Sequence, residues 1–143
     1  MSIPVVYWSG TGNTEKMAEA IAAGIREGGA EATVLGIDAI SPEELAGNAV
    51  FALGCPAMGE EVLEEGEMEP FVEALEGKVS GKKILLFGSY DWGDGEWMRS
   101  WEERMKSAGA VLSGDAGVIA NMEPDQEAID LCKSAGKALA GNA

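Results

Sequence analysis

Residues 3 to 14 read Ile3-Pro4-Val5-Val6-Tyr7-Trp8-Ser9-Gly10-Thr11-Gly12-Asn13-Thr14. The apolar first half predicts a buried strand, and a helical pattern with apolar residues at Met17, Ile21 and Ile25 follows the polar second half. A hydroxyl-rich loop between a strand and a helix N-terminus is typical of a phosphate site, because backbone N–H groups and the positive end of the helix dipole face the same point. We therefore expect residues 9–14 to hold a phosphate group.

The composition of this loop narrows the kind of phosphate ligand. The loop contains no Lys or Arg, so it lacks the Lys-Ser/Thr pair that ends a Walker loop, and Glu15 stands where a dinucleotide fingerprint has its third glycine. A single terminal phosphate fits better than a nucleoside triphosphate. The alternative is an ordinary turn in which Thr11 or Thr14 only caps the helix, although four polar side chains and two glycines exceed what a cap needs.

The rest of the chain alternates apolar runs with amphipathic helical patterns, as in a βα repeat. Buried strands are expected near residues 3–7, 32–36, 50–54, 84–89 and 111–120. Ser41 with Glu44 three residues later predicts a short capped helix, and Trp97 and Trp101 lie at helical spacing typical of core residues. Near-continuous apolar strands separated by such helices predict a doubly wound α/β fold, with a parallel sheet covered on both faces.

Length and composition favour one domain over residues 1–143, because a chain of 143 residues with 46% hydrophobic residues can bury one ordinary core. The absence of histidine excludes Ser-His-Asp and Cys-His catalysis. Cys55 and Cys132 are too few for a zinc or iron–sulfur site, so we expect no metal and no disulfide, and interpret both as small buried hydrophobes.

The net charge of -15 argues against nucleic acid and anionic membranes as partners, because both would repel the chain. The sequence opens on a strand pattern without a charged leader, and no run approaches the ~20 apolar residues of a membrane span. We therefore expect a cytoplasmic monomer whose partners are positively charged proteins.

Two further loops follow predicted strands, and they read Gly54-Cys55-Pro56-Ala57-Met58-Gly59-Glu60-Glu61 and Gly88-Ser89-Tyr90-Asp91-Trp92-Gly93-Asp94-Gly95. Together with residues 9–14 they resemble the loops of short-chain flavodoxins from fermentative anaerobes, and the resemblance extends over essentially the whole chain. It implies a flavodoxin-like five-stranded parallel sheet of order 2-1-3-4-5 with helices on both faces. It also implies noncovalent flavin mononucleotide (FMN), which shuttles between semiquinone and hydroquinone in low-potential one-electron transfer. Such a protein is an electron carrier and not an enzyme.

By this resemblance the first loop binds the phosphate of FMN, and the other two loops sandwich the isoalloxazine ring. The expected cofactor-binding residues are Ser9, Gly10, Thr11, Gly12, Asn13, Thr14, Pro56, Ala57, Met58, Gly59, Glu60, Glu61, Ser89, Tyr90, Asp91, Trp92 and Gly93. No residue is expected to be catalytic.

Particular roles follow from the same resemblance. Met58 would lie against one flavin face, unless it only fills a gap in the core, and Trp92 would stack on the outer face. The peptide after Gly59 would flip on reduction, so that its carbonyl accepts a hydrogen bond from flavin N5–H, and Glu61 would accept one from N3–H.

The family has glycine at position 91, whereas Asp91 adds a side chain and a negative charge beside the pyrimidine edge of the flavin. Trp8 borders the phosphate loop and fits either a core or a cofactor role.

An acidic run comprises Glu60, Glu61, Glu64, Glu65, Glu67 and Glu69. It is either a solvated face or the source of a negative field at the flavin that would attract basic redox proteins.

A small FMN-dependent reductase of a quinone or NAD(P)H is the leading alternative function, but no second nucleotide site is evident and Trp92 would cover the ring face that a hydride donor needs. A phosphoacceptor domain would need clustered acids where Ser9 and Gly10 stand.

Overall fold

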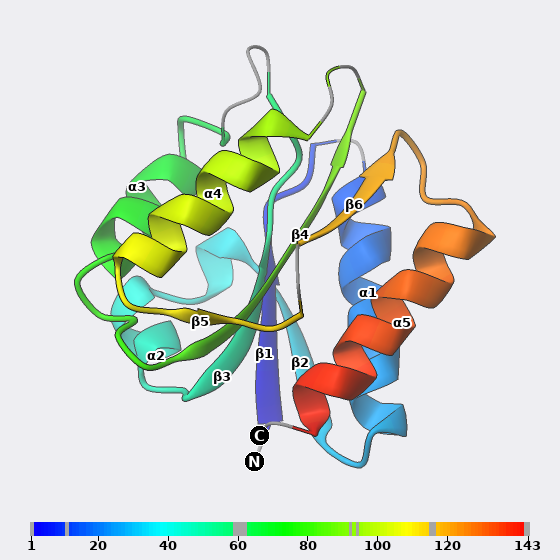
Figure 1. The fold of residues 1–143 in the computed structure, drawn as a ribbon, viewed down its shortest axis with the longest axis horizontal. Coiled ribbons are helices and arrows are strands. Elements are labelled where there is room, and N and C mark those ends of the chain that lie inside the picture. Colours follow the sequence, from blue (N-terminus) through cyan, green and yellow to red (C-terminus); the bar gives the residue numbers. More distant parts are fainter. Residues whose placement is uncertain are drawn as a thin grey trace.

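The computed structural model describes residues 2–10, 12–58, 63–91, 93, 95–114 and 117–141. Strands and helices alternate along this part of the chain (Figure 1). The elements are β1 (Ser2–Tyr7), α1 (Asn13–Glu27), β2 (Glu31–Gly36), a 3-10 turn (Ile37–Ala39), α2 (Pro42–Ala46), β3 (Val50–Gly54), α3 (Met68–Leu75), β4 (Lys83–Tyr90), α4 (Glu96–Ser107), β5 (Val111–Leu112), β6 (Val118–Asn121) and α5 (Gln126–Ala140).

The sheet is parallel and has the order β2-β1-β3-β4-β5, with β6 also paired to β4. Helices α1 and α5 cover one face, and α2, α3 and α4 cover the other (Figure 1). The expected doubly wound α/β fold is therefore confirmed. Because the strands are parallel, the loops after β1, β3 and β4 all leave the same edge of the sheet.

The last predicted strand is wrong in one respect. Instead of one strand over residues 111–120, two short strands pair with β4, Val111 and Leu112 near its start and residues 118–121 near its end. Gly114 between them has a φ of +81°, a left-handed conformation that interrupts a strand. The Gly117 N–H donates to the Glu102 carboxylate of α4 at 2.6 Å, which holds the second half of the connection. As a result β6 lies beside the end of β4, at the edge where the loops emerge.

Alternating side chains of the central strands build a separate core on each face. From β4, Ile84 and Leu86 pack toward α3 and α4, whereas Leu85 and Phe87 pack toward α1 and α5. The tryptophans of α4 lie in the first of these cores, as predicted from their spacing, and each is about 1% exposed.

Both cysteines are free and buried, which confirms their interpretation as small hydrophobes. Burial raises the pKa of the Cys55 and Cys132 thiols to about 12, so neither forms a thiolate at neutral pH.

Helices α1 and α5 pack with their backbones in close approach. A Cβ atom added to Gly24 of α1 would lie 2.0 Å from the Lys133 carbonyl oxygen of α5. A Cβ atom added to Gly136 of α5 would lie 2.1 Å from the Ile21 carbonyl oxygen of α1. The two helices can therefore approach this closely only because glycine stands at both positions.

The predicted cap of the short helix is confirmed. Ser41 Oγ accepts a hydrogen bond from the Glu44 N–H at 3.1 Å, and the Ser41 N–H donates to Glu44 Oε1 at 3.0 Å. At α5, Asp125 Oδ1 accepts from the Ala128 N–H at 2.9 Å. Side chains thus define where both helices begin.

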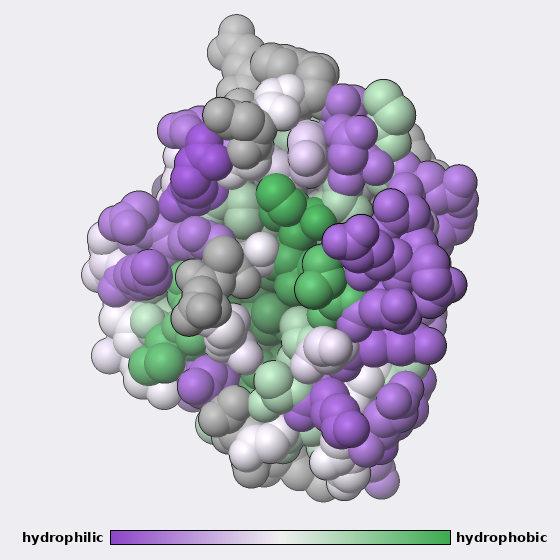
Figure 2. All heavy atoms as spheres, turned by 45° about the vertical axis from the view of Figure 1, so that its right-hand side comes forward, coloured by the Kyte–Doolittle hydropathy of each residue, from purple (hydrophilic) through white to green (hydrophobic). Residues whose placement is uncertain are grey.

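Exposed large hydrophobic side chains in the described part of the chain include Val111, Met122 and Leu131. Figure 2 shows one face of the molecule, on which hydrophilic residues form a broad area at the right and apolar residues gather toward the middle. None of the helices described is both long and apolar enough to cross a membrane. The start of β1 and the end of α5 lie at the edge of the sheet opposite the three loops (Figure 1).

Candidate functional site

The first loop brings backbone donors to the N-terminus of α1. Gly12 is the N-cap residue with a φ of +94°, and its N–H donates to Ser9 Oγ at 3.0 Å. Within the described residues no side chain caps this helix end, so the N–H groups of its first turn point toward the loop opening. Together with the positive end of the helix dipole, these groups suit an anion.

Thr14 connects the first loop to the end of β4. Its side chain is about 1% exposed, and Oγ1 lies 3.0 Å from Ser89 Oγ. The Ser89 N–H also donates to Thr14 Oγ1, at 3.4 Å. Sequence reasoning assigned these two hydroxyls to different loops, whereas the structure brings them together in a buried hydrogen bond.

The second loop begins as a continuation of the β3–β4 ladder. The N–H groups of Cys55 and Ala57 donate to the carbonyls of Phe87 (3.1 Å) and Ser89 (2.9 Å). Trp97 of α4 also donates from Nε1 to the Cys55 carbonyl at 3.1 Å. Pro56, Ala57 and Met58 are half-buried beyond this point, so the fixed stem of the loop presents them at the sheet edge.

The third loop is supported by the end of β6. The Tyr90 carbonyl accepts from the Met122 N–H at 2.6 Å and from Asn121 Nδ2 at 3.2 Å, and Asn121 Nδ2 also lies 3.4 Å from the Asp91 carbonyl. The Asp91 side chain is exposed, and Gly93 has a φ of +91°, which glycine adopts readily. Sequence reasoning missed Asn121, although a polar residue that ends a strand at this edge was a usable signal.

A turn after the second loop joins it to the first loop. The Glu64 carboxylate accepts from three N–H groups, those of Gly66 at 2.7 Å, Glu67 at 2.7 Å and Met68 at 3.0 Å. Glu67 Oε1 in turn accepts from Trp8 Nε1 at 3.1 Å. Trp8, whose role was open from the sequence, therefore connects the strand before the phosphate loop to this turn.

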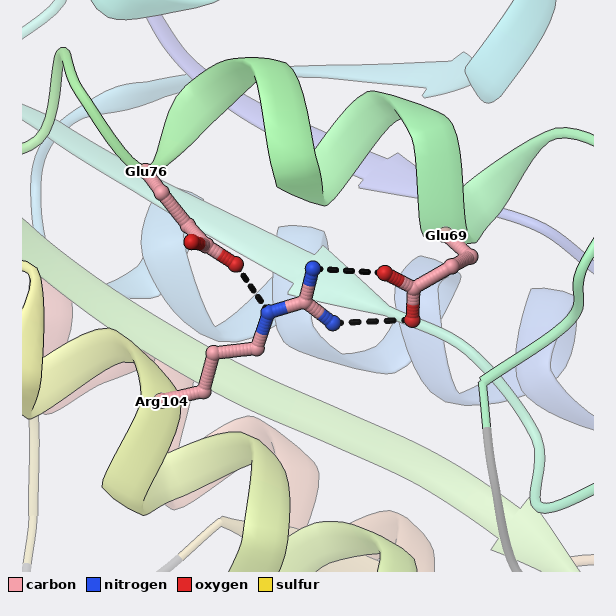
Figure 3. Close-up of polar contacts among 3 residues, drawn as sticks. All are labelled: Glu69, Glu76 and Arg104. Atoms are coloured by element: carbon pink, nitrogen blue, oxygen red, sulfur yellow. Dashed lines mark hydrogen bonds and ion pairs between the residues drawn. The ribbon is translucent and has the colours of Figure 1, made fainter.

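An arginine of α4 holds both ends of α3 (Figure 3). Arg104 donates from Nη1 and Nη2 to the two carboxylate oxygens of Glu69, at 2.8 and 2.6 Å, and from Nε to Glu76. The hydrogen bond with Glu69 is the main cause that raises the pKa of Arg104, and the hydrogen bond with Glu76 adds to it. Partial burial acts in the opposite direction, but these bonds to the charged guanidinium outweigh it. Helices α3 and α4 follow the second and third loops, so this contact joins the helices that follow these two loops.

We predict that Arg104→Gln lowers the free energy of unfolding by about 1 to 2 kcal/mol, because the variant loses a bidentate pair whose arginine side chain is 26% exposed. Arg99→Gln is the matched control on the same helix, since the Arg99–Glu96 pair is 54% and 60% exposed and should contribute about 0.5 kcal/mol or less. Urea unfolding of both variants measures the difference. Equal losses would show that the Arg104 contact has no special role.

The acidic run is thus only partly a solvated face. Glu64, Glu67 and Glu69 each bind other groups of the chain, whereas Glu65 is exposed. The sequence has no basic residue between Arg26 and Lys78, yet Arg104 reaches this region from α4. A pairing so distant in sequence could not be found from the local charge pattern.

Five of the predicted cofactor-binding residues lie outside the described part of the chain, namely Thr11, Gly59, Glu60, Glu61 and Trp92. The others gather at the edge where β1, β3 and β4 end, in three loops connected by the Thr14–Ser89 and Ala57–Ser89 hydrogen bonds.

Comparison with known proteins agrees with this geometry. The family model described as Flavodoxin matches residues 5–134. The chain belongs to the flavodoxin family. It is 52% identical to a flavodoxin of Clostridium beijerinckii over 136 residues, which cover 95% of this chain and 97% of the relative. It is 45% identical to a flavodoxin of Megasphaera elsdenii over 138 residues, which cover 96% and 98% of the two chains.

Solved structures show the same relationship for this flavodoxin-family chain. The solution structure of two-electron reduced Megasphaera elsdenii flavodoxin matches with a TM-score of 0.88 and 45% identity, and the match covers 99% of both chains. The resemblance also extends into a longer protein, because a nitric oxide reductase of Moorella thermoacetica is 30% identical over 134 residues, which cover 90% of this chain but 33% of the relative.

Family membership makes the chain an FMN-binding electron-transfer protein that is not an enzyme, and the reductase alternative is not favoured. The described residues fit the cofactor. The first loop offers N–H groups and hydroxyls without any basic side chain, as an anionic phosphate at a helix N-terminus allows. The left-handed φ of Gly12 requires glycine there, and a Cβ atom on it would meet nothing within 4 Å, so the backbone is open to a close approach.

Proposed function

We propose that the chain is a single domain over residues 1–143 that carries single electrons at low potential, with FMN in the crevice formed by its three loops. In this proposal Ser9, Gly10, Thr11, Gly12, Asn13 and Thr14 bind the phosphate, and residues of the second and third loops enclose the flavin ring. The single observation that carries the proposal is the gathering of these loops at the edge of the sheet where β1 and β3 are neighbours.

The phosphate would be held by dipoles and not by charges. The first turn of α1 supplies N–H groups, and Ser9 Oγ fixes the N–H of Gly12 so that the loop keeps its shape. Each hydrogen bond to a charged group contributes about 1.5 to 3 kcal/mol. Two such bonds to the phosphate would favour FMN over riboflavin at least a hundredfold, as ~1.4 kcal/mol corresponds to tenfold in affinity.

The ring would lie between Met58 and Trp92, with the pyrimidine edge toward residues 59–61 and 91. Met58 is half-buried at the end of a loop stem fixed by β4, which suits a polarizable side chain against a flat ring. Asn121 holds the carbonyls of Tyr90 and Asp91, so the N–H groups of the third loop keep one direction. When bound, FMN accepts and releases single electrons.

Charge at the loop edge would keep the potential low. A unit negative charge ~10 Å away at an effective dielectric constant of ~20 costs roughly 1 to 2 kcal/mol for each negative charge added to the cofactor, and ~1.4 kcal/mol is about 59 mV for one electron. Asp91 and Glu65 are exposed at this edge, while Lys16 and Arg99 are paired with Glu123 and Glu96. A few unbalanced carboxylates therefore lower the second one-electron potential by on the order of 100 mV.

The same distribution of charge favours basic partner proteins that dock on the loop edge. Lys78, Lys82 and Lys83 lie where β4 begins, at the opposite edge. A carrier with one acidic end would turn that end toward a basic redox protein and accelerate productive encounters. We propose that such exchange takes place in the cytoplasm.

Titration of the apoprotein with FMN and with riboflavin tests the phosphate site, and anaerobic reduction of the FMN-loaded protein tests the carrier function. We expect FMN to bind at least about a hundredfold more tightly than riboflavin, and reduction to proceed in two separate one-electron steps. Equal affinities would contradict the phosphate site. Direct two-electron bleaching by NADH or NADPH would support the reductase and contradict the carrier.

A further inference from the structure

We propose that Glu64 is a positioning residue for the second loop, because it fixes the point at which the chain leaves that loop. This inference rests on the proposed function, since it assumes that residues 58–61 contact the cofactor. It assigns Glu64 a role in setting the first one-electron potential without any contact with the flavin.

Every polar group of Glu64 is bonded within the chain. Its Oε2 accepts from the Gly66 N–H at 2.7 Å, and its Oε1 accepts from the N–H groups of Glu67 at 2.7 Å and Met68 at 3.0 Å. Its carbonyl accepts from the Glu69 N–H at 2.8 Å. The carboxylate thus organises the turn that leads into α3.

The backbone of Glu64 also closes the base of the loop. Its N–H approaches Cys55 Sγ at 3.5 Å, and the thiol lies 3.4 Å from the Pro56 carbonyl, so one buried thiol touches both ends of the segment that carries residues 56–63. Leu63 and Met68 on either side of the turn are buried in the core beneath α3. Both ends of the loop are therefore attached to the packed interior.

The turn is further attached to the phosphate loop. Glu67, whose N–H is held by Glu64, accepts a hydrogen bond from the Trp8 indole at 3.1 Å. The Trp8 ring lies against Gly10, where an added Cβ atom would meet the ring at 3.2 Å. The exit of the second loop is in this way placed relative to the first loop.

The charge state of Glu64 agrees with this role. Burial alone would raise its pKa, but the three backbone N–H bonds outweigh burial and lower the pKa below its ordinary value. The carboxylate is therefore ionised at neutral pH. In this form it is the stronger hydrogen-bond acceptor for the three N–H groups of the turn. A loop that is already ordered at both ends loses less conformational freedom when it bonds to a ligand.

The test compares Glu64→Ala and Glu64→Gln with Glu65→Ala and Glu65→Gln in the FMN-loaded protein. Glu65 is the adjacent, exposed residue, so each pair of variants removes one carboxylate from the same turn and matches the purely electrostatic effect. The first one-electron potential reports how much more tightly the protein binds the cofactor after one electron has been added.

We expect the preference for the one-electron-reduced cofactor to be about tenfold weaker in Glu64→Ala than in Glu65→Ala. The first one-electron potential of Glu64→Ala would then be about 59 mV lower than that of Glu65→Ala. Glu64→Gln keeps one acceptor oxygen and should lie between Glu64→Ala and Glu65→Gln. Because Glu64→Gln is nearly isosteric, it also carries the test if the alanine variant fails to fold.

Amide hydrogen exchange of the apoprotein gives a second readout that needs no cofactor. The amides of Gly66, Glu67 and Met68 should exchange at least about tenfold faster in Glu64→Ala than in Glu65→Ala. Faster exchange with equal potentials in each pair would show that Glu64 only begins α3, which overturns the inference. Unchanged exchange also overturns it, because the anchor would then be absent. If wild-type protein does not take up FMN, the proposed function fails and this inference fails with it.

Discussion

Gly136→Ala should lower the free energy of unfolding by about 2 to 3 kcal/mol, even though alanine is the better helix former by about 1 kcal/mol at an open helical position. The added Cβ atom would lie 2.1 Å from the Ile21 carbonyl oxygen. The obstacle is backbone and not the end of a flexible side chain, so α1 and α5 must move apart. The movement loosens the core formed by both helices on that face of the sheet.

Urea unfolding of the apoprotein measures this change, and Ser134→Ala provides the control because Ser134 is exposed on the same helix. The control should gain a few tenths of a kcal/mol from helix propensity alone. A gain in Gly136→Ala as well would mean that the two helices are farther apart than the structure places them.

Trp92→Ala should weaken FMN binding by roughly ten- to a hundredfold. A stacked aromatic side chain contributes about 1 to 3 kcal/mol per base, and ~1.4 kcal/mol is tenfold in affinity. Trp92 itself lies outside the described residues, but its neighbour Asp91 is bonded to Asn121 at the edge of the sheet where we propose that FMN binds. Fluorescence titration of the apoprotein with FMN measures the loss.

The control for this variant is Trp92→Phe, which retains an aromatic face and should keep most of the affinity. Losing the outer wall also lets water reach the ring, so both one-electron potentials of Trp92→Ala should differ from wild type. Wild-type affinity and potentials in Trp92→Ala would remove Trp92 from the cofactor site.

Local patterns predicted most of the fold. Apolar runs and the four-residue spacing at Met17, Ile21 and Ile25 placed the helices and the first four strands, and Ser41 with Glu44 located a cap. The break near Gly114 was missed, although Ser113, Gly114 and Asp115 interrupt the two apolar runs with residues that favour a turn.

The site was predicted as a set of loops but not as a network. Motifs in the sequence show which loops are polar, and parallel strands bring their ends to one edge. Contacts between distant segments, such as Thr14 with Ser89 or Arg104 with Glu69, depend on the packing of helices and strands and leave no local pattern. Asn121 is different, because its place at the end of the last strand was a local signal, although its partners, the carbonyls of Tyr90 and Asp91, belong to another strand and the loop that follows it.

The placement of the chain ends matters for how this protein can be joined to other molecules. The start of β1 and the end of α5 both emerge at the edge opposite the three loops (Figure 1). A tether attached at either end, whether to an electrode surface or to a catalytic domain, would leave the loop edge open to solvent. Electrons would then be exchanged at the loop edge, where we propose that FMN binds, while the opposite edge of the sheet carries the tether.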